Sequence, residues 1–160
     1  QNWKLMVVPH EPGEAQLQNL EALFEGVSIR YSGNQKNYEG ARVLIVDAMG
    51  KLSRLYRYGD LAYVGGGFNQ GIHNILEATA YGLPVAFGPK HTKAREAVEL
   101  TKKELAFPVS SSKELLQVSS KLEDAELYKA KQQELIHYMQ TNSGATNTMA
   151  TYLLGLLKPD

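Results

Sequence analysis

The stretch from Leu61 to Pro89 constrains the fold of this chain more than any other. It begins with Leu61–Val64, a short apolar run typical of a buried strand, and three consecutive glycines, Gly65 to Gly67, follow directly. Consecutive glycines cost backbone entropy. The run therefore indicates either a sharp turn or a close approach of the backbone to a ligand.

A helix and a second strand follow this glycine loop. The helix is predicted from about Asn74 to Tyr81, with Asn74 as its N-cap and Gly82 just after its last turn. Pro84–Phe87 is predicted as the next strand. Because a helix connects the two strands, they are expected to be parallel, with a right-handed crossover. The glycine loop then lies at the carboxyl end of the sheet, where open α/β folds bind ligands.

Glu77 is the leading candidate for a ligand contact. It lies near the start of the predicted helix, where backbone N–H groups and the helix dipole favour a phosphate or carboxylate. A carboxylate at this place can accept hydrogen bonds from both hydroxyls of a ribose. The alternative is a capping role, because Asn74-x-x-Glu77 has the spacing of a capping box. The sequence leaves both roles open.

The rest of the chain continues the alternation of strands and helices. Strands are predicted near residues 4–8, 27–31, 41–46 and 106–109, and helices near 14–24, 52–58, 94–105, 111–122, 124–139 and 146–157. The first helix has an apolar stripe formed by Leu17, Leu20, Leu23 and Phe24, and Pro108 marks the last strand as an edge. This pattern predicts a Rossmann-like three-layer α/β/α sandwich with a mostly parallel sheet of about six strands.

Composition excludes several classes of protein. A chain of 160 residues, 43% hydrophobic and 21% charged, suits one soluble globular domain. A formal net charge of zero argues against binding nucleic acid through phosphate neutralisation. The absence of cysteine excludes disulfides, thiolate metal sites and a cysteine nucleophile. No apolar run in the sequence approaches the length of a transmembrane helix.

The segment GGGFNQGIHNILEATAYGLPVAFGP, residues 65–89, resembles the nucleotide-binding motif of the lipid A Kdo transferases (3-deoxy-D-manno-octulosonic acid transferases) of Gram-negative bacteria. That family has a glycine pair after a strand, then His-Asn-x-Leu-Glu, a helix of small residues, Leu-Pro-Val and Gly-Pro. The GIHN form is similar to the enzymes of Bacteroides-type bacteria. The resemblance implies the C-terminal, donor-nucleotide-binding half of an inverting GT-B glycosyltransferase. The full enzyme would transfer Kdo from CMP-Kdo to a lipid A precursor in lipopolysaccharide biosynthesis.

The resemblance also implies which residues contact the nucleotide. Glu77 would hold the ribose, and a segment at Met49 would border the cytidine. The implied contacts are Pro9, His10, Met49, Gly50, Lys51, Gly66, Gly67, Asn74, Ile75, Leu76 and Glu77. Two of these positions depart from the family pattern, since His10 stands where the family has Arg and Lys51 where it has Glu. The simpler interpretations are a loop histidine bonded to backbone and a solvated surface lysine.

A basic cluster follows the second strand of the motif. It consists of Lys90, His91, Lys93 and Arg95, and His73 stands just before the predicted helix. Within this group, His73, Lys90 and Lys93 are candidates for contacts to the carboxylate of an acidic sugar or to a phosphate. The alternative is a solvated helix start, although the helix dipole disfavours cations at that end.

Residues 1–160 are expected to form a single donor-binding domain cut from a longer two-domain enzyme, because the chain lacks an initiator Met. The resemblance implies a general base and an acceptor site in an N-terminal domain outside this chain, so this domain alone would not turn over. The helix within residues 143–160 is expected to pack on that N-terminal domain. The family implies no metal or redox cofactor. It implies a full enzyme at the cytoplasmic face of the inner membrane, with this fragment soluble.

Two other functions remain open at this stage. The first is a GT-B-type sugar-nucleotide epimerase or UDP-sugar transferase, since the motif spacing does not distinguish enzymes that bind CMP-sugars from enzymes that bind UDP-sugars. The second is a non-catalytic interaction domain that retains only the Rossmann-like fold.

Overall fold

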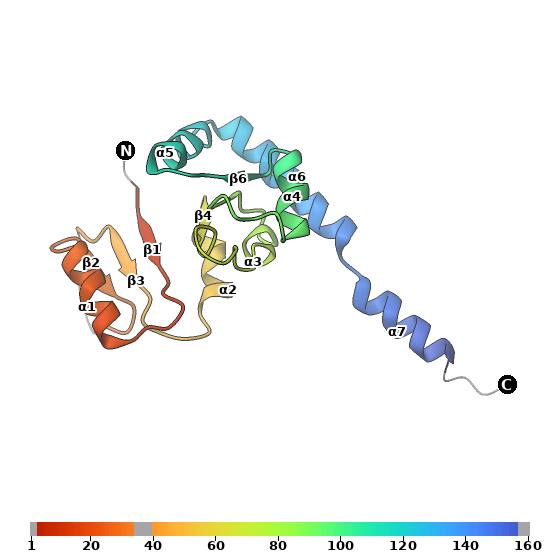
Figure 1. Ribbon diagram of the computed structural model, residues 1–160, viewed down its shortest axis with the longest axis horizontal. Helices are drawn as coiled ribbons and strands as arrows, with labels where there is room; N and C mark the ends of the chain where they lie inside the picture. Colours follow the sequence, from red (N-terminus) through yellow and green to blue (C-terminus); the bar gives the residue numbers. More distant parts are fainter. Residues whose placement is uncertain (1–2, 34–39, 157–160) are drawn as a thin grey trace. The chain divides into compact units, whose positions relative to one another are not determined.

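The computed structural model describes residues 3–33 and 40–156, except for the side chains of residues 145–148, 155 and 156. The chain divides into two compact units, residues 1–55 and residues 56–160, and each is considered by itself. Each unit contains a three-stranded sheet and helices (Figure 1). Within the described ranges, no helix combines the length and the apolar character needed to cross a membrane.

The first unit is a parallel three-stranded sheet with one long helix. Its strands β1 (Leu5–Val7), β2 (Ser28–Arg30) and β3 (Val43–Ile45) lie in the order β1-β3-β2. Helix α1 (Glu14–Leu23) packs on β3, and the short α2 (Leu52–Leu55) follows the sheet. All three strands coincide with predicted ones, and each is shorter than predicted at its ends.

The core of the first unit uses only part of the predicted helical stripe. Leu17 is buried with Val43 and Ile45, and Leu20 and Phe24 pack against them. The prediction that Leu23 belongs to this stripe is wrong, because its side chain is 72% exposed. Positions 17, 20 and 24 follow the i, i+3, i+7 spacing of one helix face, and position 23 falls beside it.

Arg30 on the edge strand β2 ties α1 to the sheet. Its guanidinium donates to Glu14 at 2.8 and 2.9 Å and to Glu21 at 2.8 Å, so both carboxylates are engaged through paired bonds. The two glutamates are seven residues apart and therefore lie on the same face of α1. The Arg30 hydrogen bonds lower the pKa of Glu14 and of Glu21.

The second unit holds another parallel sheet and most of the helices. Strands β4 (Ala62–Val64), β5 (Val85–Phe87) and β6 (Ala106–Pro108) lie in the order β4-β5-β6, which confirms the edge position of Pro108. The helices are the 3-10 helix η1 (Tyr56–Tyr58) and α3 (Leu76–Thr79), α4 (Arg95–Lys102), α5 (Ser112–Lys121), α6 (Ala125–Asn142) and α7 (Ala145–Leu156). The six predicted parallel strands are thus confirmed, and they pair as two sheets of three.

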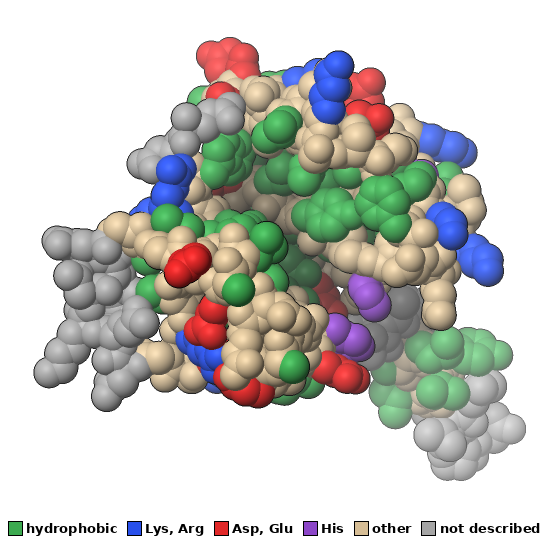
Figure 2. Space-filling model, turned by 60° about the vertical axis from the view of Figure 1, so that its left-hand side comes forward, with side chains coloured by type: hydrophobic (Ala, Val, Ile, Leu, Met, Phe, Trp, Pro, Cys, Tyr) green, Lys and Arg blue, Asp and Glu red, His purple; other side chains and the backbone are tan. Residues whose placement is uncertain are grey.

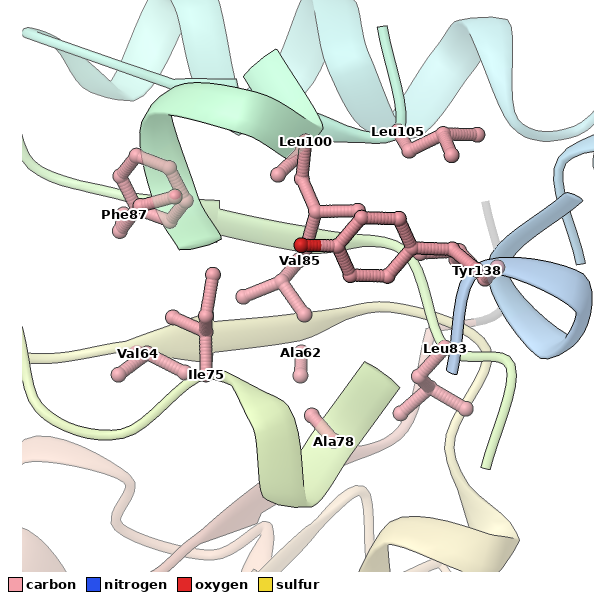
Figure 3. Close-up of a cluster of buried hydrophobic side chains, with 13 residues drawn as sticks. Ala62, Val64, Ile75, Ala78, Leu83, Val85, Phe87, Leu100, Leu105 and Tyr138 are labelled. Atoms are coloured by element: carbon pink, nitrogen blue, oxygen red, sulfur yellow. The ribbon is translucent and has the colours of Figure 1, made fainter. Parts of the chain in front are cut away.

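The central strand β5 anchors the core of the second unit. Val85, Ala86 and Phe87 are all fully buried, as expected for a strand flanked on both sides in a parallel sheet. Ala78 of α3, Leu100 of α4 and Tyr138 of α6 belong to the same cluster (Figure 3). Apolar side chains from three helices therefore cover the sheet face that carries Val85 and Phe87.

A tyrosine at the edge of this core keeps its polar end satisfied. The Tyr138 hydroxyl donates to Glu99 Oε2 at 2.8 Å, and Glu99 also accepts from Arg95 at 2.9 Å. Burial, followed by the bond to Glu99, raises the pKa of Tyr138 to about 12. Arg95 and then Tyr138 lower the pKa of Glu99. The hydrogen bond between Tyr138 and Glu99 therefore joins α6 to α4.

Several helix ends follow the predicted local chemistry. Ser111 Oγ accepts from the Glu114 N–H at 3.2 Å, which is the N-cap bond of the predicted capping box. The Glu114 carboxylate returns to the N–H of Ser110, one residue before the cap, at 2.8 Å. Gly82 has φ 71°, as its predicted place after α3 requires. A Cβ at Gly82 would also lie 2.8 Å from Gln132 Cγ, so close packing on α6 excludes a side chain as well.

Helix α4 ends earlier than predicted, at Lys102, because the chain turns at Glu104. Glu104 has φ 56°, in the left-handed region where glycine is the usual residue. The Leu105 N–H donates to Leu100 O at 2.9 Å, which closes the helix in the manner of a Schellman turn. Lys131 Nζ donates to Glu104 O at 2.7 Å and holds this turn against α6.

The loops that follow β4 and β5 touch through their backbones. A Cβ built at Gly67 would lie 2.7 Å from Gly88 N and Cα, and one built at Gly88 would lie 2.6 Å from Gly67 C. The Lys90 N–H donates to Gly67 O at 2.9 Å and continues the contact. Gly67 is therefore required for packing between the two loops. From the sequence, the glycine run was interpreted only as a sharp turn or as a close approach of the backbone to a ligand.

We predict that Glu104→Gly raises the stability of the second unit, because it removes the left-handed strain at a non-glycine residue. The gain should be about 0.5–1 kcal/mol, since the greater freedom of glycine in the unfolded chain offsets part of the relief. The measurement is the melting temperature by circular dichroism. Glu104→Ala is the control, because it keeps a Cβ and should give no increase. Equal melting temperatures for the two variants would contradict the prediction.

We predict that Gly67→Ala destabilises the protein by about 1–3 kcal/mol, because the added methyl group meets backbone that cannot move aside cheaply. Gly65→Ala is the matched control. Its Cβ would lie 3.9 Å from His73 Cδ2, an ordinary contact, and its stability should be unchanged or slightly higher. Chemical denaturation measures both variants. A Gly67→Ala protein as stable as Gly65→Ala would show that the loop contact is dispensable.

Candidate functional site

The carboxyl ends of β4 and β5 place two loops on the same edge of the second sheet. The strands are parallel neighbours, with Val64 paired to Phe87 at their ends. The glycine loop follows β4, and the loop that starts at Gly88 follows β5. The Gly67–Gly88 contact and the Lys90 N–H bond to Gly67 O fix the two loops to each other. This is the edge at which the sequence predicted a ligand site.

The glycine loop is also held internally by backbone bonds. Gly66 O accepts from the N–H groups of Asn69 and Gly71, at 2.9 and 3.3 Å. Gly65 O accepts from the His73 N–H at 3.2 Å. Gly66 has φ 90°, and a Cβ there would lie 2.3 Å from Gly71 O, so only glycine fits this turn. The loop is thus preorganised by its own backbone.

A cavity of about 570 Å³ opens between the two loops. Its lining is mostly polar, and four of its side chains are basic or imidazole. It is lined by Gly66, Asn69, Gln70, Gly71, Ile72, His73, Lys90, His91, Lys93 and Ala94. None of these ten residues is acidic. On the face drawn in Figure 2, by contrast, acidic and basic side chains are interspersed, in keeping with a net charge of zero. The cavity therefore favours an anionic ligand.

Lys90 and His91 have defined places in this cavity. Lys90 Nζ donates to Asn69 O at 3.0 Å, which positions the ammonium across the glycine loop and leaves two further N–H donors. His91 Nδ1 lies 2.9 Å from Pro89 O. The His91 ring also packs at a tilt of 49° on Phe87, with centroids 5.1 Å apart. Both side chains are oriented by the protein before any ligand binds.

Asn74 and Glu77 form a pair beside the start of α3. Asn74 Oδ1 accepts from the Leu76 N–H at 2.9 Å, and Asn74 Nδ2 donates to Glu77 Oε1 at 3.3 Å. Both side chains are exposed. Glu77 raises the pKa of Tyr56, second to the burial of that tyrosine. Asn74 thus accepts from a backbone N–H of the first turn as predicted, although the residue at the N-cap of α3 is Ile75. One Glu77 oxygen takes no part in the Asn74 contact.

The start of α3 differs from the prediction. Its regular part is Leu76–Thr79, a single turn, where the sequence predicted a helix from Asn74 to Tyr81. A helix this short sums few peptide dipoles, so its contribution to binding an anion is smaller than predicted. Ile75 is 3% exposed and belongs to the core of the second unit, so its side chain is a packing group.

The remaining predicted contacts lie in the first unit. Pro9 and His10 follow β1, and the segment Met49 to Lys51 follows β3, so both are at the carboxyl edge of the first sheet. Met49 is 69% exposed, and Gly50 has φ 71° in the turn that ends this strand. Asp47, just before them, accepts from the Ser32 N–H and hydroxyl, which lowers its pKa.

The structure thus brings together part of the predicted set. His73, Lys90, Lys93 and Gly66 line one cavity, whereas Gly67 is buried and is not part of the lining. Asn74 and Glu77 pair with each other outside the lining. The sequence-derived set lacked six lining residues: Asn69, Gln70, Gly71, Ile72, His91 and Ala94. Pro89 was the sequence signal that could have added His91 to the predicted set. A proline so soon after β5 indicates a loop, and this loop carries Lys90 and His91 at the predicted ligand edge of the sheet.

Comparison with known proteins identifies relatives of the chain. No protein-family model matches it. It is 38% identical over 115 residues to a 3-deoxy-D-manno-octulosonic acid transferase of Aquifex aeolicus, a match that covers 71% of this chain and 31% of that protein. It is also 38% identical over 92 residues to the transferase of the same name from Chlamydophila psittaci, covering 55% of this chain and 21% of that protein. The chain therefore spans less than a third of the length of these relatives.

A solved structure shares the fold. The C-terminal CMP-Kdo binding domain of WaaA from Acinetobacter baumannii aligns with a TM-score of 0.68 and 22% identity, covering 82% of this chain and 72% of that domain. This likeness confirms the Rossmann-like α/β fold predicted from the sequence. By sequence, the chain is a homologue of the 3-deoxy-D-manno-octulosonic acid transferases over the matched residues, and the solved structure adds the fold.

Proposed function

We propose that this chain is the donor-binding domain of a glycosyltransferase that uses CMP-Kdo. The observation that carries the proposal is the cavity between the β4 and β5 loops, which gathers Lys90, Lys93 and two imidazoles and contains no acidic side chain in its lining. A cytidine monophosphate ester of an octulosonic acid carries a phosphate and a carboxylate. Two ammonium groups and loop amides are suitable partners for these two anions.

Residues outside this cavity lining are also proposed to contact the nucleotide. Glu77 would accept hydrogen bonds from the ribose hydroxyls through the oxygen that Asn74 does not engage. The exposed segment Met49 to Lys51, with Pro9 and His10, would border the cytidine. Lys51 stands where the family has Glu, so a carboxylate at this position cannot contact the cytidine. The backbone of residues 49–51 can still do so, and this contact is therefore assigned to the backbone.

The chemistry assigned to this domain is electrostatic. Transfer of Kdo with inversion at the anomeric carbon passes through an oxocarbenium-like transition state while negative charge grows on the departing phosphate. Fixed donors in a loop cradle stabilise that charge without having to reorganise during the reaction. The acceptor would be a lipid A precursor, and the general base would lie in an N-terminal domain. The chain's own residues would hold and orient the leaving group, and no metal or redox cofactor is needed for that task.

The last helix supports a two-domain arrangement. The described side chains at positions 149–154 of α7 are all exposed, and they include Met149, Tyr152, Leu153 and Leu154. Apolar side chains on a helix need a covering surface, and an N-terminal domain would supply it. The full enzyme would act at the cytoplasmic face of the inner membrane, where such an acceptor is available. Residues 157–160 of the predicted C-terminal segment lie outside the described residues.

We predict that Glu77→Gln raises the dissociation constant for CMP about tenfold to a hundredfold, the loss expected when charge-assisted hydrogen bonds become neutral ones. Gln keeps an oxygen for Asn74 Nδ2, so the melting temperature should not change. Isothermal titration calorimetry with CMP, UDP and NAD measures the effect. Glu126→Gln, a first-turn glutamate of α6, is the matched control and should bind CMP like the wild-type chain.

Three results of this experiment would count against the proposal. Unchanged CMP affinity in Glu77→Gln would leave Glu77 with only its capping function. A preference for UDP over CMP would replace the Kdo donor with a UDP-sugar and point to another transferase or an epimerase. Failure of all three nucleotides to bind at millimolar concentration would favour a non-catalytic domain that retains the fold.

A further inference from the structure

His91 is the cavity residue whose hydrogen-bonding role the structure defines most completely. Its Nδ1 lies 2.9 Å from Pro89 O, and a carbonyl oxygen can only accept, so Nδ1 carries the hydrogen. The ring is half-buried and packs on Phe87, which is fully buried. Two contacts on rigid parts of the protein therefore fix the tautomer and the plane of the imidazole.

This arrangement determines what His91 offers to a ligand. In the neutral imidazole with hydrogen on Nδ1, Nε2 is a hydrogen-bond acceptor. No described residue forms a hydrogen bond with Nε2. The other titratable side chains of the cavity are His73, Lys90 and Lys93, and the two lysines can only donate. His91 thus adds an acceptor to a cavity that otherwise attracts anions.

An acceptor beside two cations matches a particular class of ligand. A phosphodiester or a simple carboxylate has no hydrogen to give to Nε2, whereas a sugar acid has hydroxyl groups close to its carboxylate. We propose that His91 Nε2 accepts a hydrogen bond from a sugar hydroxyl while the acid group of the same sugar binds beside Lys90 and Lys93. The inference rests on the proposed function and makes His91 a specificity-determining residue for the sugar part of the donor.

The test compares three anions: free 3-deoxy-D-manno-octulosonic acid, pyruvate and sulfate. Binding is followed at pH 8 by amide chemical shifts of the chain. His91→Phe keeps a ring on Phe87 and loses the acceptor. It should raise the dissociation constant for the sugar acid about threefold to tenfold, the loss of one neutral hydrogen bond, and leave pyruvate and sulfate unchanged.

Two further variants separate the acceptor from the fold. His91→Gln keeps an amide oxygen to accept and an amide N–H for Pro89 O, so it should retain most of the affinity for the sugar acid. His137→Phe on α6, an exposed histidine outside the cavity lining, is the matched control and should change nothing. Melting temperatures of all variants report on folding.

The proposal is overturned if His91→Phe binds the sugar acid as well as the wild-type chain does. It is also overturned if the variant loses pyruvate and sulfate to the same degree, because His91 would then contribute to anion binding in general or to the structure. CMP binding separates this inference from the proposed function. A chain that binds the sugar acid through His91 and does not bind CMP would contradict the nucleotide assignment alone.

Discussion

The backbone contact between Gly67 and Gly88 is the constraint on which the site depends. It joins the loops that follow two adjacent parallel strands, and neither loop could approach the other if either residue carried a Cβ. The bond from the Lys90 N–H to Gly67 O continues the same contact and sets where the basic residues after β5 begin. The fold thus positions Lys90 and His91 through backbone geometry, before their side chains make any contact.

Electrostatics follow from this geometry. A chain with zero net charge has no general attraction for anions, yet the contact between the loops gathers Lys90, Lys93 and two imidazoles around one cavity. Lys90 is tied to Asn69 O and His91 to Pro89 O, so the cost of ordering these side chains is met during folding. A preorganised cluster of this kind can select a ligand by both its charge and its hydroxyl groups.

Local chemistry made much of the fold predictable. Gly82, the Ser111–Glu114 capping box and the buried run of β5 each signal their structure within a few residues of sequence, and each was predicted. The errors concern tertiary context. Leu23 fits a helical stripe but is exposed to solvent. Glu104 adopts the left-handed conformation at the end of α4, where a glycine would have been the usual sequence signal. The packing of Gly67 depends on Gly88, 21 positions away, and no local pattern shows that the two backbones meet.

The central claim is that a cytidine nucleotide binds at the carboxyl edge of the β4–β5 pair. Its most direct test is titration of the isotopically labelled chain with CMP while the backbone amide signals are followed. The account predicts the largest shifts at residues 65–77 and 90–94, with further shifts at Met49 to Lys51. Shifts confined to the α4–α6 surface around Glu99 and His137, or the absence of any shift at millimolar CMP, would contradict it.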